Sequence, residues 1–167
     1  MYMADYTIDT SSLGRLRSVN IYSSITGKYR EITPQELLSF DSNNIPFETQ
    51  AINYYQIAEL AERANYRLEN AKQDVDHRHG QLYNKFVSDP ALREANNGKK
   101  PTDTMINAAI VSDDEYDRLI KVVNRISYEY KALNRLAKAF EQRKDLMQSI
   151  SAQRRAMQVY GGSNSGQ

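Results

Sequence analysis

The chain has 167 residues, of which 26% are charged and 40% hydrophobic, and its formal net charge is +1. This length fits one domain with its own core, and the absence of cysteine excludes disulfides, thiolate metal sites and cysteine nucleophiles. No apolar run approaches the roughly 20 residues that a membrane-spanning helix needs, and the N-terminus lacks a basic segment followed by an apolar one. The composition therefore predicts a soluble protein that binds no membrane.

The charge is unevenly distributed along the chain. Residues 1–90 contain 9 bases and 12 acids, residues 91–117 contain 3 and 6, and residues 118–167 contain 10 and 3. The three segments thus have net charges of −3, −3 and +7. This asymmetry indicates a polyanionic partner, an acidic surface on a neighbouring subunit, or both.

The first 31 residues contain two short runs that are rich in β-branched and aromatic residues, SVNIYSS and KYREI, with Ile25, Thr26 and Gly27 between them. Such runs can form a small β-hairpin. They can equally belong to an arm that becomes ordered only on a partner, and the sequence leaves both alternatives open.

A short helix is predicted in TPQELLSF. Thr33 can cap it, Pro34 suits its first position, and Glu36 completes a capping box. Residues 41–44, with the sequence DSNN, are typical of a turn.

A long helix is predicted from about residue 46 to residue 86. Apolar or small residues recur there at steps of three or four, which is typical of a helical stripe. They are Ala61, Ala64, Leu68, Ala71, Val75, Leu82 and Phe86. The following SDPALREANNGKKP is dense in turn residues and is predicted to be a connector. Thr102 can then cap a further short helix, TDTMINAAIV.

The last helix is predicted to begin at SDDE, because the capping Ser112 is followed three residues later by Glu115 and acids suit this end of the helix dipole. No glycine or proline follows before Gly161, so roughly 46 residues can form one helix. Its heptads place apolar residues at one core position, which indicates coiled-coil packing. That position reads Leu119, Ile126, Leu133, Phe140 and Met147.

These elements predict an all-α fold. Its main feature is a long antiparallel helical hairpin with coiled-coil-like packing, accompanied by short additional helices. Residues 1–31 would form the N-terminal arm or hairpin, residues 32–160 the helical domain, and residues 161–167 a disordered tail. A second apolar line on the last helix, which one partner helix cannot cover, predicts a homo-oligomer. Its interface residues are Val122, Leu136 and Ile150.

Bases of the last helix fall on outward heptad positions, with one tyrosine among them. Such a row can follow the phosphates of a nucleic acid while the tyrosine stacks on an unpaired base. The candidate nucleic-acid-binding residues are Arg118, Lys121, Arg125, Tyr128, Lys131, Arg135 and Lys138. A solvated face, or contact with the acidic DDEYD segment of another protomer, remains an alternative explanation of the same pattern.

A second basic cluster, Arg78, His79, Tyr83 and Lys85, lies near the end of the first long helix. His77 and His79 are two residues apart and would point about 200° from each other on a helix, so no metal site is predicted. The chain also lacks a phosphate-binding glycine-rich loop, an HExxH motif and a GxSxG motif. Neither an enzyme nor a cofactor is therefore expected.

The order of these parts resembles the UvsY-type recombination mediators of tailed phages over residues 32–158. The likeness runs from TPQELLSF, through the long helix that ends in RHGQLYNKF, to the segment from AAIVSDDEYDRL to QRRAM. It implies a small helical oligomer in the host-cell cytoplasm that binds single-stranded DNA. It also implies contacts with a RecA-like recombinase and a single-strand-binding protein while the recombinase is loaded.

In this resemblance the second basic cluster corresponds to the family's DNA-contacting run. The correspondence is incomplete, because histidine and glutamine stand where more basic residues would be expected and Gly80 interrupts the run. Residues 1–31 have no counterpart. The alternative function is a structural or assembly protein, such as a scaffold or adaptor, whose basic helix meets an acidic protein surface.

Overall fold

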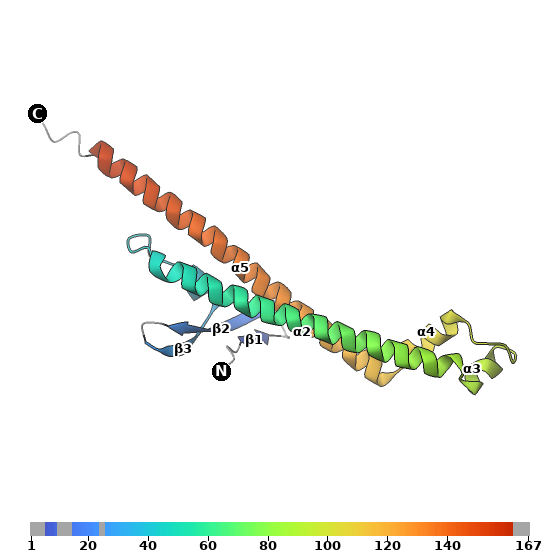
Figure 1. Ribbon diagram of the computed structural model, residues 1–167. Coiled ribbons are helices and arrows are strands. Elements are labelled where there is room, and N and C mark those ends of the chain that lie inside the picture. Colours follow the sequence, from blue (N-terminus) through green and yellow to red (C-terminus); the bar gives the residue numbers. More distant parts are fainter. Residues whose placement is uncertain (1–5, 10–14, 24–25, 162–167) are drawn as a thin grey trace, which may run out of the picture. The chain divides into compact units, whose positions relative to one another are not determined.

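The computed structural model describes residues 6–9, 15–23 and 26–161, which are mostly helical. The chain divides into two compact units: unit 1 comprises Met1–Glu62 and Lys131–Gln167, and unit 2 comprises Arg63–Tyr130. Two long helices, α2 (Phe47–Val87) and α5 (Asp114–Gly161), each contribute residues to both units (Figure 1). The predicted disordered tail lies outside the described residues, except for Gly161 at the end of α5.

Unit 1 contains a small antiparallel sheet in the order β1 (Tyr6–Asp9), β2 (Arg15–Ser23), β3 (Lys28–Ile32). The β2–β3 hairpin confirms the one predicted from the sequence. Gly27 closes its turn with φ 66°, and the Gly27 amide donates to the Ser23 carbonyl at 2.9 Å. Ile25 lies outside the described residues. Strand β1 was not predicted.

The short helix α1 (Pro34–Leu38) follows the sheet and has the predicted capping box. The Thr33 hydroxyl accepts from the Glu36 amide, and a Glu36 carboxylate oxygen accepts from the Thr33 amide at 2.9 Å. This backbone hydrogen bond from Thr33 is the main cause that lowers the pKa of Glu36. The predicted turn after α1 is confirmed as well, since the Asn44 amide donates to the Asp41 carbonyl at 3.1 Å.

The core of unit 1 forms between α2 and α5, whose segments run antiparallel there. The Gln50 side chain donates to the Phe140 carbonyl at 2.9 Å, and the Tyr54 hydroxyl donates to Glu141 at 2.7 Å. On the other side of α2, Gln56 and the Tyr22 backbone exchange two hydrogen bonds, which join the sheet to this helix. The buried apolar residues of the two helices in this unit are Ile57, Leu60, Ala61, Ala132, Leu133, Leu136, Ala137, Phe140 and Met147.

The expected second apolar line on α5 needs a correction. Leu136 is only 5% exposed because it belongs to the core of unit 1, so it is not left uncovered. Val122 and Ile150 are half-buried. The prediction failed at Leu136 because the chain packs two adjacent apolar lines of α5, and not one, against its own core.

In unit 2, α2 buries the predicted stripe: Ala64, Leu68, Ala71, Val75 and Leu82. The connector contains a helix that was not predicted, α3 (Pro90–Ala95), which Asp89 caps by accepting from the Ala91 amide at 2.8 Å. Thr102 caps α4 (Asp103–Val111) as predicted. Ile106 and Ile110 of α4 pack against Leu82, and these three residues form a buried cluster.

The predicted cap of the last helix is wrong by one residue. Ser112 ends α4, and its hydroxyl donates to the Ala108 carbonyl at 2.9 Å. Asp113 instead accepts from the Tyr116 amide at 2.9 Å and so caps α5. Ser112 is in a helical backbone conformation, whereas an N-cap residue needs an extended one. From Asp114 the helix continues without a break to Gly161, as predicted.

Candidate nucleic-acid interface

Three cations form an exposed row on α5 within unit 1. Lys131, Arg135 and Lys138 are four and three residues apart, so they share one side of the helix over a rise of about 10 Å. Leu133 and Phe140 face the core from the other side. In the described part of the chain, none of the three cations has an ion pair or side-chain hydrogen bond. We call these three residues the basic face.

The remaining predicted residues of this helix belong to unit 2. Arg125 is exposed and has no ionic partner among the residues that the structure describes, and the Tyr128 side chain is 45% exposed. Arg118 and Lys121 are different, because each pairs with a carboxylate one turn earlier on the same helix. Arg118 contacts Glu115 and Lys121 contacts Asp117, both at 2.5 Å.

These two local pairs lower the charge that the start of α5 can offer to a ligand. The carboxylate of Glu115 raises the pKa of Arg118, and the carboxylate of Asp117 raises the pKa of Lys121. Both cations remain solvent-exposed, and surface pairs of this kind contribute little to stability because solvent screens them. A phosphate can therefore displace the carboxylates, but with a smaller gain than at the basic face.

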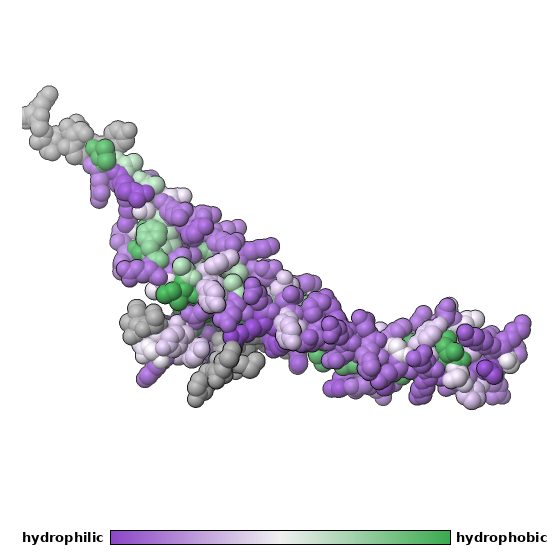
Figure 2. Space-filling model, viewed as in Figure 1, coloured by the Kyte–Doolittle hydropathy of each residue, from purple (hydrophilic) through white to green (hydrophobic). Residues whose placement is uncertain are grey.

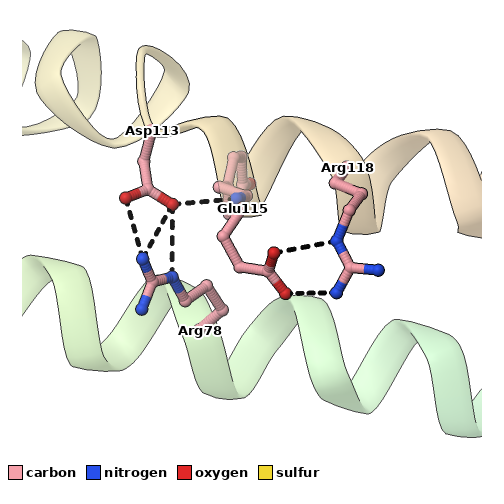
Figure 3. A network of polar contacts seen from close by, with 5 residues as sticks. Arg78, Asp113, Glu115 and Arg118 are labelled. Atoms are coloured by element: carbon pink, nitrogen blue, oxygen red, sulfur yellow. Dashed lines mark hydrogen bonds and ion pairs between the residues drawn. The ribbon is translucent and has the colours of Figure 1, made fainter.

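Arg78 of the second basic cluster is held by an acid at the start of α5 (Figure 3). Its Nε and Nη2 donate to one Asp113 oxygen at 3.2 and 2.9 Å, and Nη2 also donates to the other oxygen at 2.8 Å. The hydrogen bonds from Arg78, followed by that from the Tyr116 amide, lower the pKa of Asp113. Arg78 thus joins α2 to the cap of α5 within unit 2.

The other members of the second basic cluster also make contacts inside unit 2. The His79 ring stacks on Tyr83 with centroids 6.5 Å apart and lies 6.1 Å from the ring of Tyr116. The Tyr83 hydroxyl donates to Asp103 at 3.0 Å, which raises the pKa of Tyr83. Lys85 extends over the Phe86 ring at 5.3 Å. The cluster therefore stabilises the packing of α2 against α4 and α5 in this unit.

Within the described residues no group of three histidine or acidic side chains is placed to hold a metal ion. His77 contacts Gln81 at 2.9 Å. In the same residues, no helix has the length and apolar character to cross a bilayer. The view in Figure 2 agrees with this, since hydrophilic residues cover most of that face and the apolar ones lie in small groups.

Sequence analysis missed one buried cation in unit 1. Arg143 is only 8% exposed and donates to the backbone carbonyls of Leu38 and Ser39 and to the side chain of Gln50. Its guanidinium also lies over the rings of Phe40 and Phe140. In the sequence, Arg143 resembles the exposed cations that precede it on the helix. Only its position on the core side of the heptads indicated that it is buried.

Comparisons with protein-family models, with curated proteins and with solved structures find no match for this chain. The functional argument therefore depends on the charged surfaces themselves. The strongest of these is the basic face of unit 1, whose cations contact neither a carboxylate nor the core among the described residues.

Proposed function

We propose that this chain binds single-stranded DNA through the basic face of α5 and acts as a recombination mediator of the UvsY type. The observation that carries the proposal is the row of Lys131, Arg135 and Lys138, which is exposed and has no acidic partner in the described residues. Unpaired cations at helical spacing release counterions from a phosphate backbone without first breaking contacts of their own.

Binding of this kind depends strongly on salt. Each phosphate that a cation neutralises on a single strand adds about −0.7 to the slope of log K against log salt concentration. Three cations therefore contribute a slope of about −2, which weakens binding about 18-fold when the salt concentration rises fourfold. In unit 2, the exposed ring of Tyr128 can stack on an unpaired base.

The mediator role extends the DNA-binding proposal to proteins. In it, a homo-oligomer with coiled-coil-like packing acts in the cytoplasm and helps a RecA-like recombinase replace a single-strand-binding protein. Support comes from the order of helices and turns between α1 and the end of α5, which is the order that the resemblance to UvsY-type proteins requires. Val122 and Ile150, each half-buried in its own unit, remain the proposed interface positions.

The first experiment measures fluorescence anisotropy of a labelled oligothymidine at two salt concentrations. The variant Lys131→Gln/Arg135→Gln/Lys138→Gln is expected to bind at least tenfold more weakly, with a slope less steep by about 2. The control Lys28→Gln/Lys99→Gln/Lys100→Gln removes three exposed cations elsewhere and should retain most of the affinity. Equal affinity of the two variants would show that the basic face is not the binding site.

The second experiment tests the mediator role separately. The DNA-dependent ATPase of a RecA-like recombinase is followed on oligonucleotide coated with single-strand-binding protein. The wild-type chain should shorten the lag before ATP hydrolysis, whereas the basic-face variant should not. Tight DNA binding with an unchanged lag would reject the mediator role and retain only the DNA-binding activity.

A structural or assembly role remains the second candidate. The observation in its favour is an acidic and aromatic surface on α2 whose spacing and charge complement the basic face.

A further inference from the structure

The outer side of α2 in unit 1 has a regular pattern of acidic, aromatic and small residues. Glu48, Ala51, Tyr55, Ala58 and Glu62 follow one another at steps of three and four residues, as in a heptad seam. Tyr55 is 68% exposed, and Glu48, Ala51 and Glu62 are exposed as well. We call these five residues the acidic seam.

Nothing in the described residues neutralises this surface. Glu48 and Glu62 have no ion pair there. Neighbouring Ile52 is 45% exposed and adds apolar area beside Tyr55. This side of α2 exposes an aromatic ring and an aliphatic side chain between two acids without an ion pair. Such a pattern is typical of a surface that another helix covers.

The basic face of α5 has the matching pattern. Lys131, Arg135, Lys138 and Gln142 are spaced at four, three and four residues and are all exposed. The two surfaces have opposite charge, and the basic face, which extends over about 10 Å, is short enough to lie between Glu48 and Glu62, which are about 21 Å apart along α2. They also match in size, because long basic side chains can lie over the small Ala51 and Ala58, and a guanidinium can stack on the Tyr55 ring.

The two surfaces cannot meet within one chain. Inside unit 1, α2 and α5 already contact each other through different sides, where Gln50 donates to the Phe140 carbonyl and Tyr54 donates to Glu141. The acidic seam lies on the side of α2 opposite the buried Ile57 and Ala61. The basic face that complements it must therefore come from another molecule.

We propose that the acidic seam of one copy binds the basic face of a second copy. Because the two surfaces differ, the contact is heterologous, and repetition of it gives a ring or an open filament. The basic face is also the DNA site of the proposed function, so a second copy and single-stranded DNA compete for Lys131, Arg135 and Lys138. Only this competition rests on the proposed function; the self-association does not.

The test uses charge reversal on each surface and sedimentation velocity over a series of protein concentrations without DNA. Glu48→Lys/Glu62→Lys and Lys131→Glu/Lys138→Glu should each weaken self-association by at least tenfold. A mixture of these two variants should associate again. The reversed, basic seam of the first variant can bind the reversed, acidic face of the second, and the unchanged seam of the second can bind the unchanged face of the first. The control Asp74→Lys/Asp76→Lys reverses two exposed acids of α2 in unit 2 and should associate like the wild type.

Three outcomes would overturn the proposal: a monomeric wild type, unchanged association of Glu48→Lys/Glu62→Lys, or a mixture that does not associate. The competition is then measured with the uncharged variant Glu48→Gln/Glu62→Gln, which adds no cation. It should bind oligothymidine several-fold more tightly than the wild type and than Asp74→Gln/Asp76→Gln. Normal self-association without any DNA binding would refute the proposed function and leave the contact between copies intact.

Discussion

Replacement of Arg143 by alanine is expected to destabilise the protein much more than replacement of any exposed cation of the same helix. The side chain is 8% exposed, and in the described residues its polar partners are two backbone carbonyls and the uncharged Gln50, with no carboxylate. Burial lowers the pKa of Arg143, yet arginine stays protonated at any pH at which the protein folds. Unit 1 therefore holds a charged group that it compensates only with dipoles and aromatic rings.

The magnitude follows from these contacts. A hydrogen bond from a charged donor contributes about 1.5–3 kcal/mol, and Arg143 makes two strong ones, to Leu38 at 3.0 Å and to Gln50. Its contacts with Phe40 and Phe140, at 5.2 and 5.0 Å, add about 0.5–1 kcal/mol each. The gross loss is about 4–8 kcal/mol, from which several kcal/mol are regained because no guanidinium has to be desolvated. We expect a net loss of about 2–4 kcal/mol.

Urea unfolding followed by far-ultraviolet circular dichroism measures this change. With a slope of about 2 kcal/mol per molar urea, the midpoint should fall by about 1–2 M. The matched control is Arg155→Ala, which removes an exposed cation of α5 without a partner in the described part of the chain and should change stability by less than about 0.5 kcal/mol. If both variants shift the midpoint equally, the buried contacts of Arg143 do not stabilise unit 1, and the reasoning is refuted.

Three further predictions concern unit 2. Arg78 lowers the pKa of Asp113 in the folded protein. The stability from this carboxylate is therefore present above its ordinary pKa of 3.8 and is lost as the pH falls through the lower folded value. Asp113→Asn should reduce the melting temperature at neutral pH and make its decline towards about pH 3 less steep. Gly80→Ala should raise the free energy of unfolding by about 0.5–1 kcal/mol, because this helical position has open space around an added Cβ. Gly98→Ala should lower it by about 1 kcal/mol, because φ is +76° there, and urea midpoints distinguish the two signs.

Periodicity and capping residues predicted most of the helical fold. The stripe on α2 and the seam of Leu133, Phe140 and Met147 on α5 are buried, and both helices have nearly the predicted ends. Such patterns are informative because a long helix can bury only one side, and alanines or large apolar residues must then recur every three or four positions. The capping box of α1 was predictable for a similar reason, since Thr33 and Glu36 satisfy each other locally.

The elements that sequence analysis missed depend on residues far away in the chain. Strand β1 is short and pairs with β2, and a single short run carries no signal of such a partner. The cap of α5 is Asp113 and not Ser112 because α4 extends through Val111, and because Arg78, 35 residues earlier, binds the aspartate. Likewise, the row of bases on α5 is visible in the sequence, but which of these bases pair with acids depends on the fold.

The basic residues after residue 117 differ in the contacts that they make. Arg118 and Lys121 are paired with acids of their own helix, Arg143 is buried, and Arg154 donates to Asn43 at 3.0 Å. Among the residues that the structure describes, neither the basic face nor the acidic seam of the same unit has such a contact. Like charges on a surface repel one another and lower stability when no opposite charge pairs with them. Two oppositely charged surfaces on one unit therefore favour a contact between molecules that pairs them.

The proposed contacts would make DNA binding and self-association dependent on each other. If both use the basic face, each bound strand removes a subunit contact, and each subunit contact hides three cations from DNA. Linkage then requires that DNA weaken self-association by the same factor by which self-association weakens DNA binding. A protein of this kind would release its neighbouring copies as it binds a strand. A static scaffold with the same charges would not need a basic face that is accessible to a polyanion.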